Sequence, residues 1–290
     1  MRPIVFTAAA LAALTLATPA HAAKVRDWNK SWNVSSTPVI RIVTDEARVR
    51  VHRGEGGRVV ARVHYSVSSW GLTSGPREPK VELEQSGDTV RIVAREQHDW
   101  VVFGAIETKF EVDVTVPGDC DLSARSGDGS INCEALQGAI ALESGDGAIR
   151  ATGLRGDVVL MSGDGGIDAD SLDGSLLART GDGRLRVAGR FDRLDLRTGD
   201  GRLEATVRAG SQAAEAWNVE SGDGSITLRI PRDLSVLLDA GTRDGALRVD
   251  LPVTTRGAIR HDTLAGSLNG GSVPLRVRSA DGDITLALSP

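Results

Sequence analysis

The chain has 290 residues and a formal net charge of −5, with 40% hydrophobic, 25% charged and only 3% aromatic residues. This mixture is too apolar for a disordered chain, the 34 glycines lack the three-residue period of collagen, and two cysteines cannot build a disulfide scaffold. The mildly acidic balance also argues against nucleic acid as a partner. Because aromatic residues are scarce, the core must consist of Ile, Leu, Val and Ala.

Residues 1–22 are predicted to be a secretory signal peptide. Arg2 gives a positive start, residues 4–18 form an apolar run, and Ala20-His21-Ala22 is an A-x-A cleavage site. The apolar run is shorter than the roughly 20 residues of a spanning helix, and no other stretch is long enough. Cleavage leaves 290 − 22 = 268 residues with a charge of 33 − 39 = −6. We therefore expect an exported protein, periplasmic or extracellular, with no transmembrane segment after cleavage.

Residues 23–120 are predicted to form a β-rich region that caps the repeat following it. Apolar and polar residues alternate in several segments, most clearly from Phe110 to Val116, and Pro117-Gly118 ends the region. Either a small sheet domain or irregular coils would fit. A bare apolar coil is an aggregating edge, so a cap is expected at this end, and residues 264–274 are expected to contribute to a cap at the other. The candidate strands are 39–44, 47–52, 58–67, 80–84, 89–95 and 109–116.

The segment 98–104, HDWVVFG, lies between two candidate strands and is unusually apolar. Its Trp100 and Phe103 would either pack on the core as part of a cap or form an exposed recognition loop for a partner or glycan. The other tryptophans are also expected outside the regular coils, with Trp217 in a five-residue insertion (23 − 18 = 5). Burial of Trp100 would distinguish the cap from the loop.

Residues 121–290 contain an internal repeat of the tetrapeptide Ser/Thr-Gly-Asp-Gly. The first five copies follow each other at a step of 18 residues, and the sixth comes after 23. Degenerate copies begin at Thr242 and Ser279, and we interpret their gap of 37 residues as two periods with one motif eroded. The six intact copies begin at Ser126, Ser144, Ser162, Thr180, Thr198 and Ser221.

Equal positions of the repeat carry equal kinds of residue. With each Ser or Thr as position 0, positions 5, 7, 10, 14 and 16 are apolar and position 6 is polar; in the first copy, Asn132 stands between Ile131 and Cys133. Apolar residues two apart predict a strand with one buried face, so each period holds two short strands, near positions 4–8 and 13–17.

This periodicity predicts an all-β fold, a single-chain parallel β-helix or β-solenoid with 18-residue coils. At about 4.8 Å per coil, the chain from Ser126 onward makes about nine coils and a rod of roughly 40 Å. The general crossover preference favours the right-handed form. Left-handed solenoids also use 18-residue coils, but as three equal hexapeptides, whereas the apolar spacing here is uneven.

The aspartates of the repeat share one column, which has two interpretations. In a purely structural turn, Gly supplies positive φ and Asp caps its own backbone. Alternatively the column binds calcium weakly, because stacked carboxylates repel unless they are paired or metal-bound, and calcium-binding β-rolls carry a related G-G-x-G-x-D-x-U-x motif. The second half of each coil lacks a matching motif, so no cofactor is predicted and calcium stays the alternative. The column consists of Asp128, Asp146, Asp164, Asp182, Asp200 and Asp223.

Charged residues beside the motif are expected to pair across the surface, since arginines such as Arg125 and Arg197 share their column with Glu143 and Glu220. The two cysteines, Cys120 and Cys133, allow a disulfide between the N-terminal region and the first coil, or two buried thiols. No metal site is predicted, because the histidines are scattered and no ligand spacing occurs.

No motif of a known catalytic class is present: G-x-S-x-G, H-E-x-x-H, C-x-x-C and the P-loop are all missing from the sequence. Polysaccharide-cleaving β-helix enzymes need one irregular cluster of charged residues, whereas the columns here are regular. We therefore expect a protein that is not an enzyme, with such a polysaccharide-active enzyme as a lesser alternative.

The repeated S/T-G-D-G-x-[IL], together with Val114-Thr115-Val116-Pro117 and the late segments 268–275 and 280–284, resembles the bacterial DUF4097 family of predicted adhesins and the related head domain of GIN-type proteins. The resemblance implies a β-solenoid without catalytic residues. The sequence thus predicts a secreted or periplasmic adhesin-like binding or structural module of the cell envelope, whose partner is an envelope protein, a glycan or another copy of itself. A calcium-stabilised β-roll-like scaffold is the main alternative.

Overall fold

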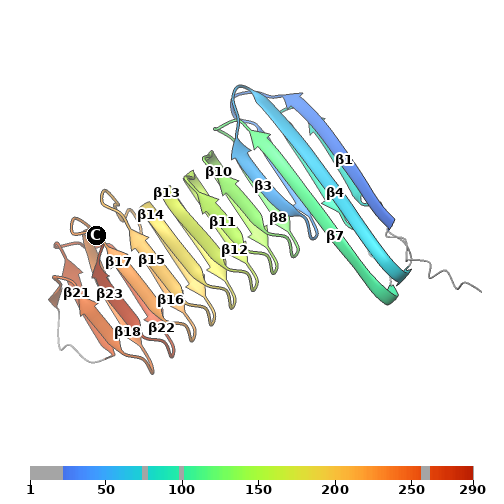
Figure 1. The fold of residues 1–290 in the computed structure, drawn as a ribbon. Helices are drawn as coiled ribbons and strands as arrows, with labels where there is room; N and C mark the ends of the chain where they lie inside the picture. Colours follow the sequence, from blue (N-terminus) through green and yellow to red (C-terminus); the bar gives the residue numbers. More distant parts are fainter. Residues whose placement is uncertain (1–21, 74–77, 98–100, 256–261, 290) are drawn as a thin grey trace, which may run out of the picture.

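The computed structural model describes residues 22–73, 78–97, 101–255 and 262–289, and the regular secondary structure of these residues is β-strand throughout. The strands stack into a long rod, an all-β parallel β-solenoid (Figure 1). No helix with the length and apolarity to cross a membrane occurs in these residues. The predicted signal peptide lies outside them, except for Ala22, which begins the first strand.

Each regular coil contributes one strand to each of two faces. Face 1 holds the strand that precedes the Ser/Thr-Gly-Asp-Gly turn, and face 2 holds the strand that follows it. Pairing is parallel with a step of one period, so that Ile149 lies between Ile131 and Ile167. The strands of face 1 are β8 (Asp121–Ser126), β10 (Gln137–Ser144), β12 (Arg155–Ser162) and the second halves of β13 (Ile167–Thr180) and β14 (Leu185–Thr198). Those of face 2 are β9 (Ile131–Glu134), β11 (Ile149–Thr152), the first halves of β13 and β14, and β15 (Leu203–Val207).

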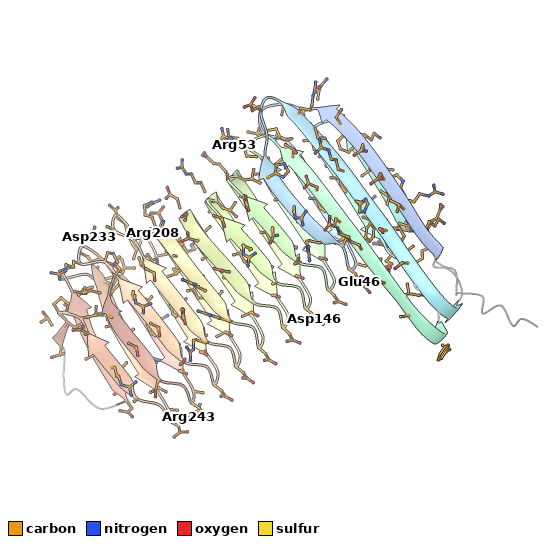
Figure 2. The ribbon with its side chains drawn as sticks, viewed as in Figure 1. Glu46, Arg53, Asp146, Arg208, Asp233 and Arg243 are labelled. Carbon is orange, nitrogen blue, oxygen red and sulfur yellow. The ribbon has the colours of Figure 1, made fainter. Side chains whose placement is uncertain are left out.

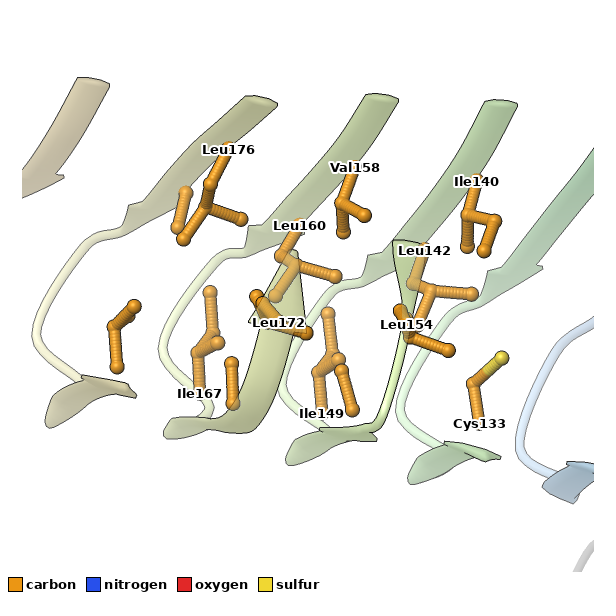
Figure 3. Packing of buried hydrophobic residues seen from close by; sticks show 14 of the residues in the cluster. Cys133, Ile140, Leu142, Ile149, Leu154, Val158, Leu160, Ile167, Leu172 and Leu176 are labelled. Atoms are coloured by element: carbon orange, nitrogen blue, oxygen red, sulfur yellow. The ribbon is translucent and has the colours of Figure 1, made fainter. Parts of the chain in front are cut away.

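The core is a narrow column of aliphatic side chains between the two faces, as Figure 3 shows for the first regular coils. The predicted inward positions are confirmed: Ile140, Val158 and Leu176 of position 14 are at most 3% exposed, and Cys133 and Ala151 of position 7 are fully buried. Position 6 faces outward as predicted. With like residues stacked on like, each coil buries the apolar row that it could not bury alone.

One further coil comes from the N-terminal region. Strands β2 (Val39–Thr44) and β3 (Arg48–Arg53) pair in parallel with β8 and β9, and Thr44 occupies the place of the repeat's Ser or Thr. On their other side, β2 and β3 pair in parallel with β6 (Thr89–Arg95) and β7 (Val101–Val116). Residues 39–53 therefore lie between two segments that follow them in the sequence.

Antiparallel strands complete this end of the rod. On face 2, β4 (Arg58–Thr73) pairs with β7 and with β1 (Ala22–Asn33), and these long strands extend well beyond the width of the coils (Figure 1). On face 1, β5 (Lys80–Ser86) forms a hairpin with β6. The two faces meet where Lys30 Nζ donates to the Leu83 carbonyl at 2.7 Å and Gln85 Nε2 donates to the Asn33 carbonyl at 3.0 Å.

The C-terminal end also departs from sequence order. After β16 (Trp217–Ser221) and β17 (Ile226–Ile230) come β18 (Val236–Thr242) and β19 (Leu247–Asp250), but β22 (Pro274–Ser279) and β23 (Ile284–Leu288) lie between these two coils. The interpretation of the 37-residue gap as two stacked periods is therefore wrong. The gap contains β20 (Thr254–Thr255) and β21 (Thr263–Leu268), and β21 runs antiparallel to β18 and covers the end of face 1, as expected for a cap.

Two smaller expectations need correction. Trp217 is not in the insertion outside the core: it lies in β16, opposite Leu275, and is fully buried, with its indole N–H donating to the Asp192 carbonyl at 3.2 Å. The insertion falls in the connection between β15 and β16. In addition, Val101–Gly104 belong to β7 and pair with β4, whereas the sequence predicted them to lie between strands.

Candidate functional site

The hydroxyl of each repeat turn is buried and binds the turn of the neighbouring coil. Ser144 Oγ donates to the Gly129 carbonyl at 3.1 Å, Ser162 Oγ to the Gly147 carbonyl at 3.2 Å, and Thr180 Oγ1 to the Gly165 carbonyl at 2.9 Å. In the turns that begin at Ser126, Ser144, Thr242 and Ser279, the hydroxyl also accepts a hydrogen bond from its own turn, as from the Gly147 N–H to Ser144 Oγ at 3.1 Å. The Ser/Thr column is therefore a structural ladder, with no hydroxyl left over for chemistry in these turns.

The motif glycines are required by close approach between coils. A Cβ on Gly147 would lie 2.3 Å from the Gly129 carbonyl oxygen, and one on Gly183 would lie 2.2 Å from that of Gly165. The expectation that these glycines supply positive φ is wrong, because positive φ occurs elsewhere in the coil, as at Gly156 (φ 105°). The turns stack backbone on backbone with no space for a side chain.

The six predicted aspartates all point to solvent along one edge of the rod, where Figure 2 labels Asp146 between Glu46 and Arg243. The described residues include no group of three or more His, Cys, Asp or Glu side chains that could hold a metal ion. None of the side-chain hydrogen bonds of the motif turns involves an Asp of this column, so the expected self-capping is not seen at these turns. The column is an exposed carboxylate edge.

Ion pairs between neighbouring coils are present as predicted. Arg125 Nε lies 3.0 Å from Glu143 Oε2, and Arg197 Nε lies 3.5 Å from Glu220 Oε2, in each case between register partners on adjacent strands. These side chains are largely exposed, so the pairs contribute little to stability and mainly balance charge on the surface.

Cys120 and Cys133 are both buried and both free, so the structure contains two thiols and no disulfide between them. Burial, with a smaller effect from Asp121 and Asp119, raises the pKa of Cys120 from 9.0 to about 11. Burial also raises the pKa of Cys133, and Cys120 adds to this effect. Neither thiol is a nucleophile in this state.

The predicted recognition segment is only partly described. Trp100 lies outside the described residues, and Phe103, on β7 near its start, is 70% exposed. Elsewhere in the N-terminal region Trp32 is buried, and Tyr65 and Phe110 form an edge-to-face pair with centroids 5.3 Å apart. The aromatic residues of β4 and β7 nearer the coils therefore belong to the core.

The sequence did not point to the grooves on the outer side of face 2. The larger, about 590 Å³, crosses β13, β14, β15 and β17 and is lined by both signs of charge, including Asp168, Asp170, Arg186, Glu204 and Arg208. Arg208 Nη2 lies 2.8 Å from Asp170 Oδ1, so this groove is partly self-neutralised. A second groove of about 360 Å³ lies beside it, toward the N-terminal region. The feature of the sequence that could have revealed these grooves is the change from small residues to arginine along position 4 of the repeat, from Gly166 to Arg184.

Comparison with known proteins agrees with this architecture. A family model described as Toastrack DUF4097 matches residues 39–287. The chain belongs to the Toastrack DUF4097 family. The matched range includes the inserted coil 39–53 and nearly all of the inserted coil 274–288, so both are part of the Toastrack domain. No curated protein matches the chain.

Three solved structures are similar over most of their length. The first is a candidate cell adhesion protein from Clostridium sporogenes, with 12% identity and a TM-score of 0.29 over 92% of this chain and 100% of that one. The second is a candidate lipid-binding protein from Parabacteroides distasonis, with 13% identity and a TM-score of 0.44 over 90% of this chain and 96% of that one. The third is a candidate adhesin from Bacteroides fragilis, with 10% identity and a TM-score of 0.34 over 91% of this chain and 97% of that one. At these TM-scores the likenesses say nothing of what this chain binds.

Proposed function

We propose that this Toastrack protein is an exported, non-enzymatic binding and structural module of the cell envelope. The observation that carries the proposal is the division of every regular coil into an inward apolar half and an outward polar half. Outward side chains recur at a coil step of about 4.8 Å and form straight columns on rigid strands. Such ladders suit a long repetitive partner, and the predicted signal peptide would bring the protein to the envelope.

The electrostatics of the carboxyl groups support binding over catalysis. A glycosidase needs one carboxyl with a raised pKa to act as the acid. Among the described residues, the carboxyls with a clear shift all have a lowered pKa, caused by hydrogen bonds and ion pairs. Arg190, for example, lowers the pKa of Asp192 through two hydrogen bonds of 2.7 and 2.9 Å. These carboxylates are held in structural ion pairs or, at Asp88, by hydrogen bonds from Ser35.

The proposal is tested by localisation and binding together. The full chain and a variant lacking residues 2–22 are expressed in a bacterial host, and cell fractions are probed for the protein. We expect only the full chain to reach the periplasm or medium, in a processed form. The purified mature chain is then applied to envelope fractions, a glycan array and polysaccharide substrates. Saturable envelope or glycan binding is expected, and turnover of a polysaccharide would overturn the proposal.

A further inference from the structure

The smaller groove on face 2 is a basic trough with a floor of small residues. The floor consists of Ser130, Ala148 and Gly166, which occupy position 4 in three successive coils. The same column carries arginine at both ends, Arg48 from the N-terminal coil and Arg184 from the coil after Gly166. Small residues between two arginines thus leave the hollow of about 360 Å³.

Two more arginines line the trough from position 6. Arg150 and Arg186 are both exposed, and no salt bridge joins either of them to a described residue. The one acidic side chain of the trough, Asp168, stands in register between them.

The arginines at the two ends do have acidic neighbours outside the trough. Arg48 Nη1 lies 3.7 Å from Glu111 Oε1, and Arg184 Nη2 lies 2.8 Å from Glu204 Oε2. The lining of the trough itself, four arginines against one aspartate, carries 4 − 1 = +3, in a chain whose net charge is −5.

We propose that this trough binds an extended anionic polysaccharide along the rod axis, an inference that names the partner class of the proposed function. Arg48 and Arg184 are four coil steps apart, about 19 Å, so only a ligand with several anionic groups can reach both. Arginine donates in a planar fork that matches carboxylate, sulfate or phosphate oxygens. Arg150 and Arg186, which form no salt bridge with a described residue, can bind the anionic groups of the polymer that lie between Arg48 and Arg184.

The lining favours a polysaccharide over other polyanions. Single-stranded nucleic acids bind through aromatic side chains that stack on bases, and no aromatic residue lines the trough. Ser130 in the floor offers a hydroxyl and Asn132 beside it offers an amide, and both groups suit sugar hydroxyls. Without a stacking platform, recognition depends on charge, so a neutral glycan should not bind.

Ala148 allows a matched test, because it is exposed at the centre of the floor and either sign of charge can be placed there without disturbing the core. The mature protein, Ala148→Glu and Ala148→Lys are titrated with polygalacturonate, dextran sulfate and neutral dextran at low salt. The wild type and Ala148→Lys should bind one or both anionic polymers and not dextran, and the carboxylated and sulfated probes identify the preferred group. Ala148→Glu should bind about tenfold or more weakly, since it repels the anion and engages the arginines.

A second pair of variants locates the charge. R150Q/R186Q should also weaken binding about tenfold or more, whereas R232Q/R276Q, which removes two exposed arginines that line neither groove of face 2, should stay within about twofold. Equal binding by Ala148→Glu and Ala148→Lys would overturn the proposal. So would a preference for single-stranded oligonucleotide, or a concentration-dependent dimer that Ala148→Glu abolishes, which would point to the carboxylate edge of a second copy.

Failure of the trough can be told from failure of the proposed function. If the mature chain binds envelope fractions but none of the anionic polymers, the trough proposal is wrong and the envelope role stands. If the chain is not exported but Ala148→Glu still loses polymer binding, the envelope role is wrong while the anion site of the trough is real.

Discussion

The middle of the solenoid and its two ends follow different rules of assembly. In the middle, each coil pairs with the coils one period before and after it, so sequence order and spatial order agree. At the N-terminal end, residues 39–53 lie between 89–116 and 121–134. At the C-terminal end, residues 274–288 lie between 217–230 and 236–250. In both places the coil nearest the chain end is held between two others.

This difference shows how a repeat protein closes its ends. A terminal coil that stacked last would have one neighbour and could unfold locally, whereas an inserted coil is hydrogen-bonded to a neighbour on both sides. The insertion requires distant pairings, such as Val43 with Arg125 and Ile226 with Ile284, in place of the single-period pairings of the middle. Pairings between distant segments cost more loop-closure entropy than pairings one period apart. We therefore expect the middle coils to fold first and the inserted coils at the ends to pair with them afterwards.

The largest effect is expected from removing the inserted coil at the C-terminal end. Deletion of residues 270–290 takes away Leu275, Val277, Ile284 and Leu286, all buried between two coils. At roughly 1.5–3 kcal/mol for each side chain, the loss is comparable with the whole stability of a domain. Limited proteolysis should show cleavage from about residue 217 onward, together with a thermal transition lowered by more than about 10 °C.

Deletion of Ser289 and Pro290 alone is the control for this truncation and should leave the melting curve nearly unchanged. If the long truncation retained the protease resistance of β16 and β17, the idea that the inserted coil holds the end together would be wrong.

The next effect comes from the close approach of turns in the middle. Gly147→Ala places a Cβ against the Gly129 carbonyl, and overpacking of this kind should cost about 3 kcal/mol. Gly87→Ala, in the hairpin of the N-terminal end, meets no atom within 4 Å but has φ 58°, so it should cost only about 1 kcal/mol. Urea unfolding of the two variants measures the difference. Equal costs would mean that the stacked turns can move apart.

The hydroxyl ladder should contribute less per residue. Thr180→Val keeps the shape of the side chain but removes the hydroxyl that donates to the Gly165 carbonyl, at a cost of about 1–2 kcal/mol. The Gly163 carbonyl, which the same hydroxyl also reaches, still accepts from the Gly181 N–H. Thr180→Ser retains the donor and should lose clearly less. The free energy of unfolding of both variants, measured by urea titration, decides this; a serine variant as unstable as the valine variant would assign the effect to the methyl group.

The cysteine pair probes the junction between the N-terminal region and the first regular coil. Because burial raises the pKa of Cys120 from 9.0 to about 11, the folded protein keeps a proton that the unfolded chain releases. The stability from this neutral thiol is complete below about pH 9 and declines by roughly 1.4 kcal/mol per pH unit as the pH rises toward 11.

Wild type and Cys120→Ala are compared by urea unfolding at pH 8 and pH 10, so that other titrating groups cancel. The stability difference between them should shrink at pH 10. An unchanged difference, together with rapid alkylation of the native thiols at pH 8, would show that Cys120 is accessible.

The smallest effect is expected from calcium. With no group of three or more suitable side chains among the described residues, millimolar calcium or a chelator should shift the melting temperature by less than about 1 °C. A rise of several degrees with calcium, reversed by chelation and lost in Asp146→Asn, would instead support the β-roll-like alternative for the aspartate column.

Much of the middle could be predicted from the sequence because its contacts are local in the repeat. A residue such as Ile149 meets its own equivalents one period away, so the column visible in the sequence is also the column in space. The outward position of Arg150 and the buried position of Cys133 followed in the same way. The role of the motif glycines was misjudged because the constraint on Gly147 comes from the neighbouring coil and not from its own φ.

The ends and the trough depended on information that periodicity does not contain. Nothing local to residues 274–288 says that they enter between two earlier coils, and Thr44-Asp45-Glu46-Ala47 is too degenerate to be recognised as a turn of the repeat. Because that turn was not recognised, the sequence could not place Arg48 in the same column as Arg184. The trough between these two arginines therefore could not be predicted.

The sequence by itself determined the coil: its length, its inward and outward positions and the aliphatic nature of its core, because each of these follows from residues that repeat every 18 positions. Only the tertiary structure decided the order of the coils at both ends and the charges that meet on face 2. Those depend on pairings between segments 37 or more residues apart, such as Leu247 with Ile284 and Ile226 with Ile284, whose free energy comes from covering an exposed apolar edge.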